Sequence, residues 1–400
     1  MWNLTPRRVQ ELCRLGLING TVRVGKSWLI PENAPKPADR RKKQAPEHSV
    51  PLTNAFPWKT PLLPFTNIYH TPGMLQQVIA DLGDRPAAAK IMEYYALCLQ
   101  GDFTGAAKAV HEFLSVPRGF YGKVSAGYVL SLCAVFQGSS RLWHEAKQHM
   151  ASAPCQSESD QLQRSFWLAA ADCAIRHHDD FPEWFVRGCF DPLPPDAYPA
   201  AYMFYANHLY ALCHDRAIGK SGEGGSLTAM LILPLALEPL VSQAKKDGLL
   251  VAELYLRLTC SAAYHNNGND GLAIMHLDAA IALALPDRLF LPLAQFRRRL
   301  DFLMDERLQK YDGAAAGKVR SLSRKYLTGW TKLHNQELGS AVTNDLTTRE
   351  YEVAKLAAYG MSNKQISDRL HISVNAVKQA LRLAMDKTGA ANRTELARYL

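Results

Sequence analysis

Apolar residues along most of the chain recur at the three- and four-residue spacing of an α-helix rather than in the alternation of a strand. Residues 74–334 are rich in Ala, Leu and aromatic side chains. Polar or glycine turns interrupt this stretch near residues 101–102, 138–139, 178–179 and 214–215. The pattern predicts an all-α body of paired helices, because recurrent turn residues stop each helix.

Two segments of this body share a further pattern, in which a glycine turn is followed five residues later by an alanine and then by a proline that closes the second helix. The first segment has Gly101, Ala106 and Pro117, and the second has Gly268, Ala273 and Pro286. This spacing resembles that of tetratricopeptide-like helical hairpins, where small residues let paired helices approach closely. An irregular helical domain is the alternative, since the period is not strict.

Composition and charge separate the two ends from the middle. The chain has 48% hydrophobic and 21% charged residues, which is typical of a folded globular protein, and a formal net charge of +9. Residues 1–47 hold ten Lys/Arg against four Asp/Glu, and residues 341–400 hold nine against six, so the middle is neutral. Basic ends indicate contact with a polyanion, since Lys and Arg release counterions from phosphates. The proline-rich stretch 35–73 is predicted to be a linker.

Residues 341–400 carry the most specific pattern. Capping boxes at residues 347–350 and 362–365, an N-cap at Ser373 and a cap at residues 392–395 predict four helices. A tight turn at residues 371–372 joins the second helix to the third, which predicts a helix-turn-helix.

The third of these helices is predicted to be amphipathic. Val377, Leu381 and Ala384 are expected to face the interior of the domain. The outward residues are amides and cations, namely Asn375, Lys378, Gln379 and Arg382. Such groups suit the major groove, because they can bond base edges and phosphates.

The segments LTTRE, GMSNKQISDRLHIS, AVK and NRTEL closely resemble the LuxR-type DNA-binding domain. The resemblance implies two sets of DNA contacts: Ser362, Asn363 and Lys364 at the backbone, and Val377, Lys378 and Gln379 in the groove. It also implies that the partner is duplex DNA and that the chain acts as a homodimer. A four-helix cap on the helical body, with solvated charges, is the alternative interpretation.

Residues 1–34 show a second, smaller pattern. A helix over TPRRVQELCRLGLI is followed by two strands, 21–24 and 27–30, around a tight turn. The segment resembles the excisionase/MerR-like winged helix, which implies a second set of DNA contacts through Arg7, Arg8, Gln10, Arg23 and Lys26. The helix and turn that come first in that family have no counterpart here. We therefore expect a truncated module, for which either the true start lies upstream or a remnant packs without binding DNA.

Motifs for other chemistry fail on their context. The segment GTVRVGKS matches a phosphate-loop expression, but no strand precedes it and no helix follows it. The two histidines of HEAKQH are one residue too far apart to chelate a metal from one helix face, and the cysteines form no CxxC pair. We expect no catalytic residues, no metal and no cofactor. Without a long apolar run or a signal peptide, the chain is expected to be cytoplasmic.

These observations predict a mainly α protein: a truncated winged-helix segment at 1–34, a linker at 35–73, a tetratricopeptide-like body at 74–334 and a LuxR-type domain at 341–400. The expected function is a DNA-binding transcriptional regulator, not an enzyme, whose body senses a small-molecule or protein effector or mediates oligomerisation. A helical-repeat adaptor with vestigial DNA-binding modules is the alternative, and an enzyme within the body is a third interpretation. The basic stretch from Arg297-Arg298-Arg299 through Lys332, with ten Lys/Arg against four Asp/Glu, is expected to be a solvated helix face or a phosphate contact.

Overall fold

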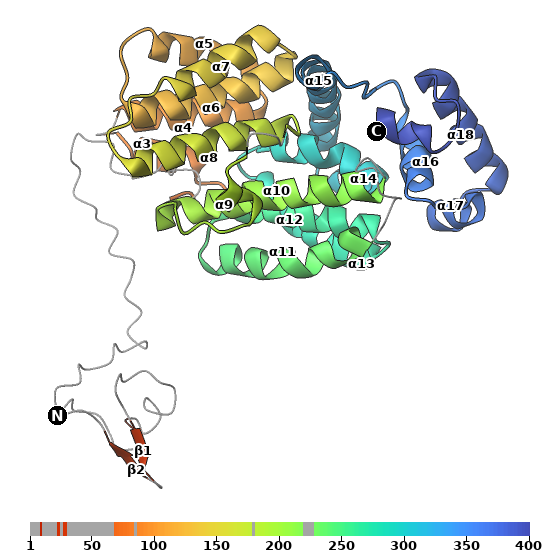
Figure 1. Ribbon diagram of the computed structural model, residues 1–400, viewed down its shortest axis with the longest axis horizontal. Helices are drawn as coiled ribbons and strands as arrows, with labels where there is room; N and C mark the ends of the chain where they lie inside the picture. Colours follow the sequence, from red (N-terminus) through yellow and green to blue (C-terminus); the bar gives the residue numbers. More distant parts are fainter. Residues whose placement is uncertain are drawn as a thin grey trace. The chain divides into compact units, whose positions relative to one another are not determined.

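The computed structural model describes residues 68–83, 86–177, 181–218 and 228–400, together with two short strands nearer the N-terminus (Figure 1). The chain divides into two compact units, residues 1–52 and residues 53–400.

In the first unit, strand β1 (Val22–Val24) pairs antiparallel with β2 (Ser27–Leu29), and Arg23 lies opposite Trp28. This pairing confirms the predicted hairpin. Of the predicted helix before it, the structure describes only Val9, which is helical. The side chains of the candidate DNA contacts Arg7, Arg8, Gln10, Arg23 and Lys26 lie outside the described residues.

The second unit consists of helices throughout its described residues. Its first half contains α3 (Leu75–Ala80), α4 (Pro86–Gln100), α5 (Phe103–Leu114), α6 (Phe120–Gln137), α7 (Ser140–Ala151), α8 (Glu158–Ala174), α9 (Glu183–Val186) and the 3₁₀ helix η1 (Pro195–Ala197). The rest of the body contains α10 (Tyr198–Ala217), α11 (Thr228–Lys246), α12 (Leu250–Asn266), α13 (Asp270–Ala284), α14 (Phe290–Tyr311) and α15 (Gly313–Leu338). None of the described helices is both long and apolar enough to span a bilayer.

Consecutive helices pack against each other as hairpins, most extensively α6 with α7, α12 with α13 and α14 with α15. Short polar side chains start several of them: Asp102 accepts a hydrogen bond from the Gly105 amide, and Ser139 accepts one from the Leu142 amide. Gly101 has φ +94°, a conformation that favours glycine at a helix end. These features confirm the predicted all-α fold, whereas assignment to the tetratricopeptide class stays a prediction.

One continuous hydrophobic core runs through the body, and Trp143 and Trp167 are among its largest fully buried side chains. Tyr69, in the stretch expected to be a linker, is also fully buried, and its hydroxyl donates to Asp287. The same carboxylate accepts a hydrogen bond from the Leu75 amide at 3.2 Å. Residues 68–73 therefore pack on the body.

One expectation about the body is wrong, and a second is wrong only in part. The turn placed near residues 214–215 does not exist, because both residues lie inside α10, where His214 is buried. In the basic stretch 297–332, Arg297 forms an ion pair with Asp305 at 2.6 Å, and Arg298 and Arg299 are partly buried, so these three arginines are not a solvated face. The later cations Lys310, Lys318 and Lys325 are exposed, and phosphate contact by the stretch stays a prediction. The turn expected near 178–179 falls largely outside the described residues.

Close helix packing makes a testable prediction for α13. Ala273 is fully buried against α12, where its carbonyl accepts a hydrogen bond from Ser261 at 2.8 Å. Ala273→Leu should overpack this crossing and lower the free energy of unfolding by about 1 to 3 kcal/mol. Urea unfolding measures this change, and Ala282→Leu, at an exposed position of the same helix, is the matched control. Equal stability of the two variants would contradict the packing described.

Candidate nucleic-acid interface

The C-terminal domain contains α16 (Thr348–Ala358), α17 (Asn363–Leu370) and α18 (Val374–Thr388), followed by the 3₁₀ helix η2 (Glu395–Tyr399). These elements are drawn in blue in Figure 1. Between α17 and α18 the chain turns at His371, which has φ +51° and ψ +46°. The left-handed residue ends α17 abruptly and lets α18 start after two residues, as the predicted helix-turn-helix requires.

The predicted caps of the three α-helices are confirmed. At residues 392–395, Asn392 accepts a hydrogen bond from the Glu395 amide at 3.0 Å, but the segment that follows is the 3₁₀ helix η2. The Thr347 amide donates to the Glu350 carboxylate at 2.8 Å, while the Thr347 hydroxyl accepts from the Glu350 amide at 3.3 Å. Ser362 and Gln365 form the same reciprocal pair at 2.8 and 3.3 Å. The Ser373 hydroxyl accepts from the Ala376 amide at 3.1 Å and starts α18. Local sequence therefore determines the start of each of the three α-helices.

The domain has its own core, which fixes how α18 is rotated about its axis. Val353 and Ile366 from the first two helices, and Val377 and Ala384 from α18, are all fully buried. Since residues three, four and seven apart share a helix face, burial of this side leaves the opposite side of α18 exposed.

The exposed side of α18 carries Asn375, Lys378, Gln379 and Arg382, each of which is exposed. Lys364 is exposed on α17, and so is Ser362 at its N-terminus. The ion pairs formed within this domain use other residues: Arg349 with Glu352, Lys387 with Glu350, and Arg398 with Glu395. We call the set Asn375, Lys378, Gln379 and Arg382 the α18 face.

Two predicted contact residues are placed differently. Val377, assigned to the groove by the resemblance, is fully buried in the domain core, so the structure supports only its other expected role as an interior residue. Asn363 is half-buried at the start of α17, and its side-chain oxygen has no hydrogen-bond partner in the structure.

Residues 344–400 match the family described as "Bacterial regulatory proteins, luxR family". The chain carries a luxR-family DNA-binding domain. Comparison with curated proteins and with solved structures gives no match for this chain. The family match favours a DNA-binding regulator over the adaptor alternative.

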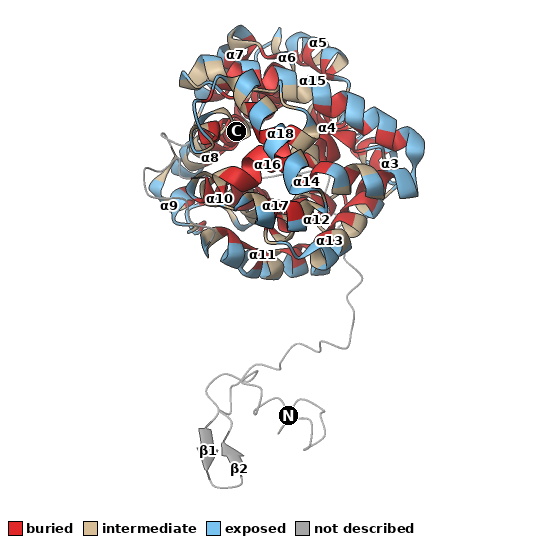
Figure 2. Ribbon diagram, turned by 90° about the vertical axis from the view of Figure 1, so that its right-hand side faces the viewer, coloured by how far each residue is buried: buried red, intermediate tan, exposed pale blue. Residues whose placement is uncertain are grey.

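The luxR-family domain packs on the helical body through its first helix, α16. Figure 2 faces this domain and shows α16 as largely buried, while α18 has exposed positions. Lys355 of α16 forms an ion pair with Asp301 of α14 at 2.9 Å, and both side chains are at least 95% buried. Asp301 has φ +49° and ψ −128°, a break inside α14. Burial opposes the charge on Lys355, but Asp301 and neighbouring tyrosines raise its pKa above the usual value.

Further contacts surround this ion pair. His214 of α10 lies 2.9 Å from the Tyr359 hydroxyl, and Arg369 of α17 donates to the carbonyl of His265. Ala217 and Ile218 of the body belong to the hydrophobic core of the luxR-family domain. The domain is therefore docked by both polar and apolar contacts, and the α18 face stays exposed in the docked state.

Sequence reasoning missed Lys355 and Asp301 as a docking pair. A lysine amid the apolar positions of α16 was a local signal, because a cation rarely sits on a buried helix face without a partner. Nothing in the sequence identified Asp301, which lies 54 residues away.

Glu352 is a second buried charge at the same interface. It is 5% exposed, and burial, followed by repulsion from Asp301, raises the pKa of its carboxyl to about 7. The other titratable or charged groups around it come from the four helices α12, α13, α16 and α17, namely His265, Asp270, Lys355, Arg349 and Arg369. In the unfolded chain the same carboxyl has a pKa near 4.5.

This difference sets a pH dependence. The folded protein holds the Glu352 proton at pH values where the unfolded chain has lost it, so the contribution of this group to stability falls as pH rises from about 4.5 to 7. Glu352→Gln should remove this decline, because glutamine does not titrate. The change that the substitution makes in the free energy of unfolding should therefore be about 1 to 3 kcal/mol more favourable at pH 8 than at pH 5. Urea unfolding at several pH values measures the difference. Glu306→Gln, at an exposed site on α14, is the control. A Glu352→Gln effect that does not vary with pH would refute the assignment.

Proposed function

We propose that this protein is a transcriptional regulator that reads duplex DNA through the α18 face, under the control of its helical body. One observation carries the proposal: Asn375, Lys378, Gln379 and Arg382 share the exposed side of the second helix of a helix-turn-helix in a luxR-family domain.

The chemistry of the α18 face suits the major groove, which is about 12 Å wide and admits one α-helix. Asn375 and Gln379 can each give two hydrogen bonds to an adenine edge, and Lys378 and Arg382 can bond guanine or neighbouring phosphates. Lys364 and Asn363 lie at the start of α17, where a phosphate also meets free helix amides. In this proposal α18 reads the bases, and α17 contacts the DNA phosphates and thereby positions the domain along the duplex.

The docked arrangement suggests how the body controls the reader. Because the α18 face is exposed in the docked state, the body does not act by covering it. Instead, the Lys355–Asp301 pair and the contacts around it fix the orientation of the reader on the body. A shift in α14 would then reorient the reader and alter how it meets DNA. Homodimerisation and DNA contact by the N-terminal segment stay predictions.

Binding of full-length protein to duplex DNA tests the proposal. A site is first selected from random duplexes, and affinity is then measured by fluorescence anisotropy at fixed salt. Lys378→Ala and Gln379→Ala should each weaken specific binding by about 1 to 3 kcal/mol if they bond bases. Lys364→Ala should weaken binding to all sequences alike, because a phosphate contact carries no sequence information.

Lys108→Ala is the matched control, since this lysine is exposed on α5 outside both the luxR-family domain and the basic stretch 297–332. It should leave affinity unchanged. Failure to select any site, or unchanged binding after all three substitutions in the domain, would contradict the proposed function and return the adaptor alternative to first place.

A further inference from the structure

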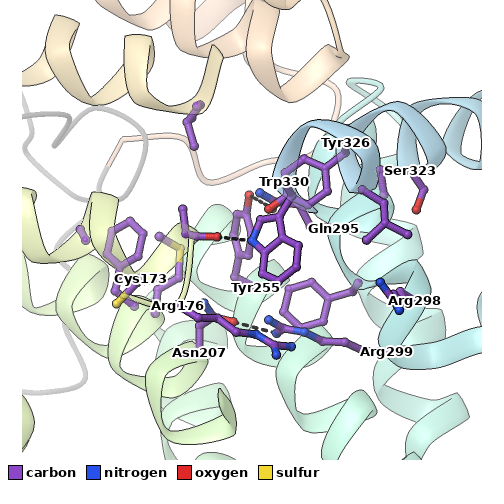
Figure 3. Close-up of a pocket in the computed structure, with 18 of the residues that line it drawn as sticks. Cys173, Arg176, Asn207, Tyr255, Gln295, Arg298, Arg299, Ser323, Tyr326 and Trp330 are labelled. Carbon is purple, nitrogen blue, oxygen red and sulfur yellow. Dashed lines mark hydrogen bonds between the residues drawn. The ribbon is translucent and has the colours of Figure 1, made fainter. Parts of the chain in front are cut away.

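A cavity of about 120 Å³ lies in the middle of the helical body. Helices α4, α6, α8, α10, α12, α14 and α15 line it, and Tyr351 of α16 and the C-terminal Leu400 close one side. Figure 3 shows the labelled side chains that line it. The helical body and the luxR-family domain therefore share this cavity.

Tight packing of α15 across α6 builds one wall of the cavity. Gly329 lies so close to α6 that a Cβ atom there would clash with the carbonyl of Phe136. The next residue, Trp330, lines the cavity, and its indole N–H donates to the carbonyl of Ala174 at 2.8 Å. This hydrogen bond fixes the indole ring in place.

Three arginines line the same cavity. Arg299 donates to the side-chain oxygen of Asn207 at 2.7 Å, and Arg176 lies over the Trp330 ring at 5.4 Å. Arg298 donates to the carbonyl of Thr343 at 3.0 Å. In Figure 3, Arg176 and Arg299 extend toward each other below Trp330. Arg176 has φ +58°, a left-handed conformation that is uncommon for a residue with a side chain.

No carboxylate among the described residues forms an ion pair with any of these three guanidinium groups; their partners are carbonyls, an amide and aromatic rings. Asp301 is a negative charge that acts on Arg298, and its carboxylate already pairs with Lys355. Burial lowers the pKa of Arg298 and Arg299, and Arg176 lowers both further by repulsion. Partly buried cations that gather at one cavity and form no ion pair with a described carboxylate indicate a site for an anion.

Most of the remaining wall is apolar or aromatic, with Phe204, Phe296 and Trp330 among its residues, and Asn207, Gln295 and Ser323 add polar groups. Its volume is close to the ~150 Å³ of an engineered apolar cavity that holds benzene. A flat apolar group of about one ring therefore fits beside the arginines. Inorganic anions would leave this part of the wall uncovered.

We propose that this cavity binds a small organic carboxylate whose apolar part is about one ring, with Arg176, Arg298 and Arg299 holding the carboxylate. Planar guanidinium groups suit this role, since their N–H groups match the two oxygens of a carboxylate.

The role of this ligand as an effector rests on the proposed function, because the carboxylate would be the effector that controls DNA binding. Arg298 also stacks on Tyr351 of α16 at 4.0 Å, and it donates a hydrogen bond to the carbonyl of Thr343 in the segment that leads into the luxR-family domain. A carboxylate that binds Arg298 competes with these contacts. Ligand binding and docking of the reader therefore share one side chain.

Isothermal titration calorimetry on the full-length protein without DNA tests the site. The probes are benzoate and phenylacetate, and the controls are benzamide and phenylacetamide, which keep the shape and lose the charge; sulfate tests the anion alone. At least one carboxylate should bind about tenfold or more tightly than its amide, because charge-assisted hydrogen bonds are stronger than neutral ones. Sulfate should bind more weakly than that carboxylate.

Arg299→Gln should weaken carboxylate binding about tenfold or more. Arg297→Gln is the matched control, because Arg297 pairs with Asp305 and does not line this cavity. Arg176→Gln serves as a second variant if circular dichroism shows that Arg299→Gln does not fold. Three results would each overturn the site. The first is equal affinity for the carboxylates and their amides, and the second is a failure of both carboxylates to bind with a Kd of 10 mM or below, a binding free energy of roughly −2.7 kcal/mol. The third is an equal loss of carboxylate affinity in Arg299→Gln and Arg297→Gln.

The same protein is then assayed for DNA binding with and without the carboxylate that binds. Protein that selects a DNA site but binds no carboxylate overturns the effector site and leaves the regulator function standing. Protein that binds the carboxylate but selects no DNA site overturns the regulator function instead.

Discussion

The buried ion pair between Lys355 and Asp301 is the constraint on which the arrangement of reader and body depends. Moving two charges out of water is costly, and their attraction offsets this only if the geometry is kept. The two residues come from different domains, so the pair is satisfied in one orientation of the luxR-family domain. Asp301 occupies a break in α14, which places its carboxylate toward α16 rather than along a regular helix face. The pair thus favours one docked orientation over others of similar apolar area.

Cations in this protein fall into three environments with different consequences. Those of the α18 face are exposed and available for phosphates and bases. Lys355 is buried and paired, so it fixes position. Arg176 and Arg299 are gathered in a cavity without a carboxylate partner among the described residues, so they attract an anion from outside. Lysine and arginine side chains thereby have three proposed roles, in recognition, docking and ligand binding, and the surroundings of each side chain decide its role.

The luxR-family domain and the cavity are linked through α14 and α16. Arg298 lies in the cavity and stacks on Tyr351. Arg298 comes three residues before Asp301 on α14, and Tyr351 comes four residues before Lys355 on α16. About one helical turn on each helix therefore separates the cavity from the docking ion pair. The hydrogen bond between His214 and Tyr359 adds α10 to this interface. Contacts of this kind can couple two sites when the element between them has two arrangements. Helix α14, with its break at Asp301, is the element that contributes to both.

Local sequence sufficed for the luxR-family domain, because caps such as Thr347 and Ser362, the turn at His371 and the helical spacing of Val377 act within a few residues of each other. It also sufficed for the helical class of the body. It did not reveal that Arg298 and Arg299 face a cavity, or that the turn expected at His214 is the middle of a helix. Those outcomes depend on side chains from helices far apart in sequence. Burial and ion pairing are properties of such assembled neighbours, so they were decided only when the helices packed.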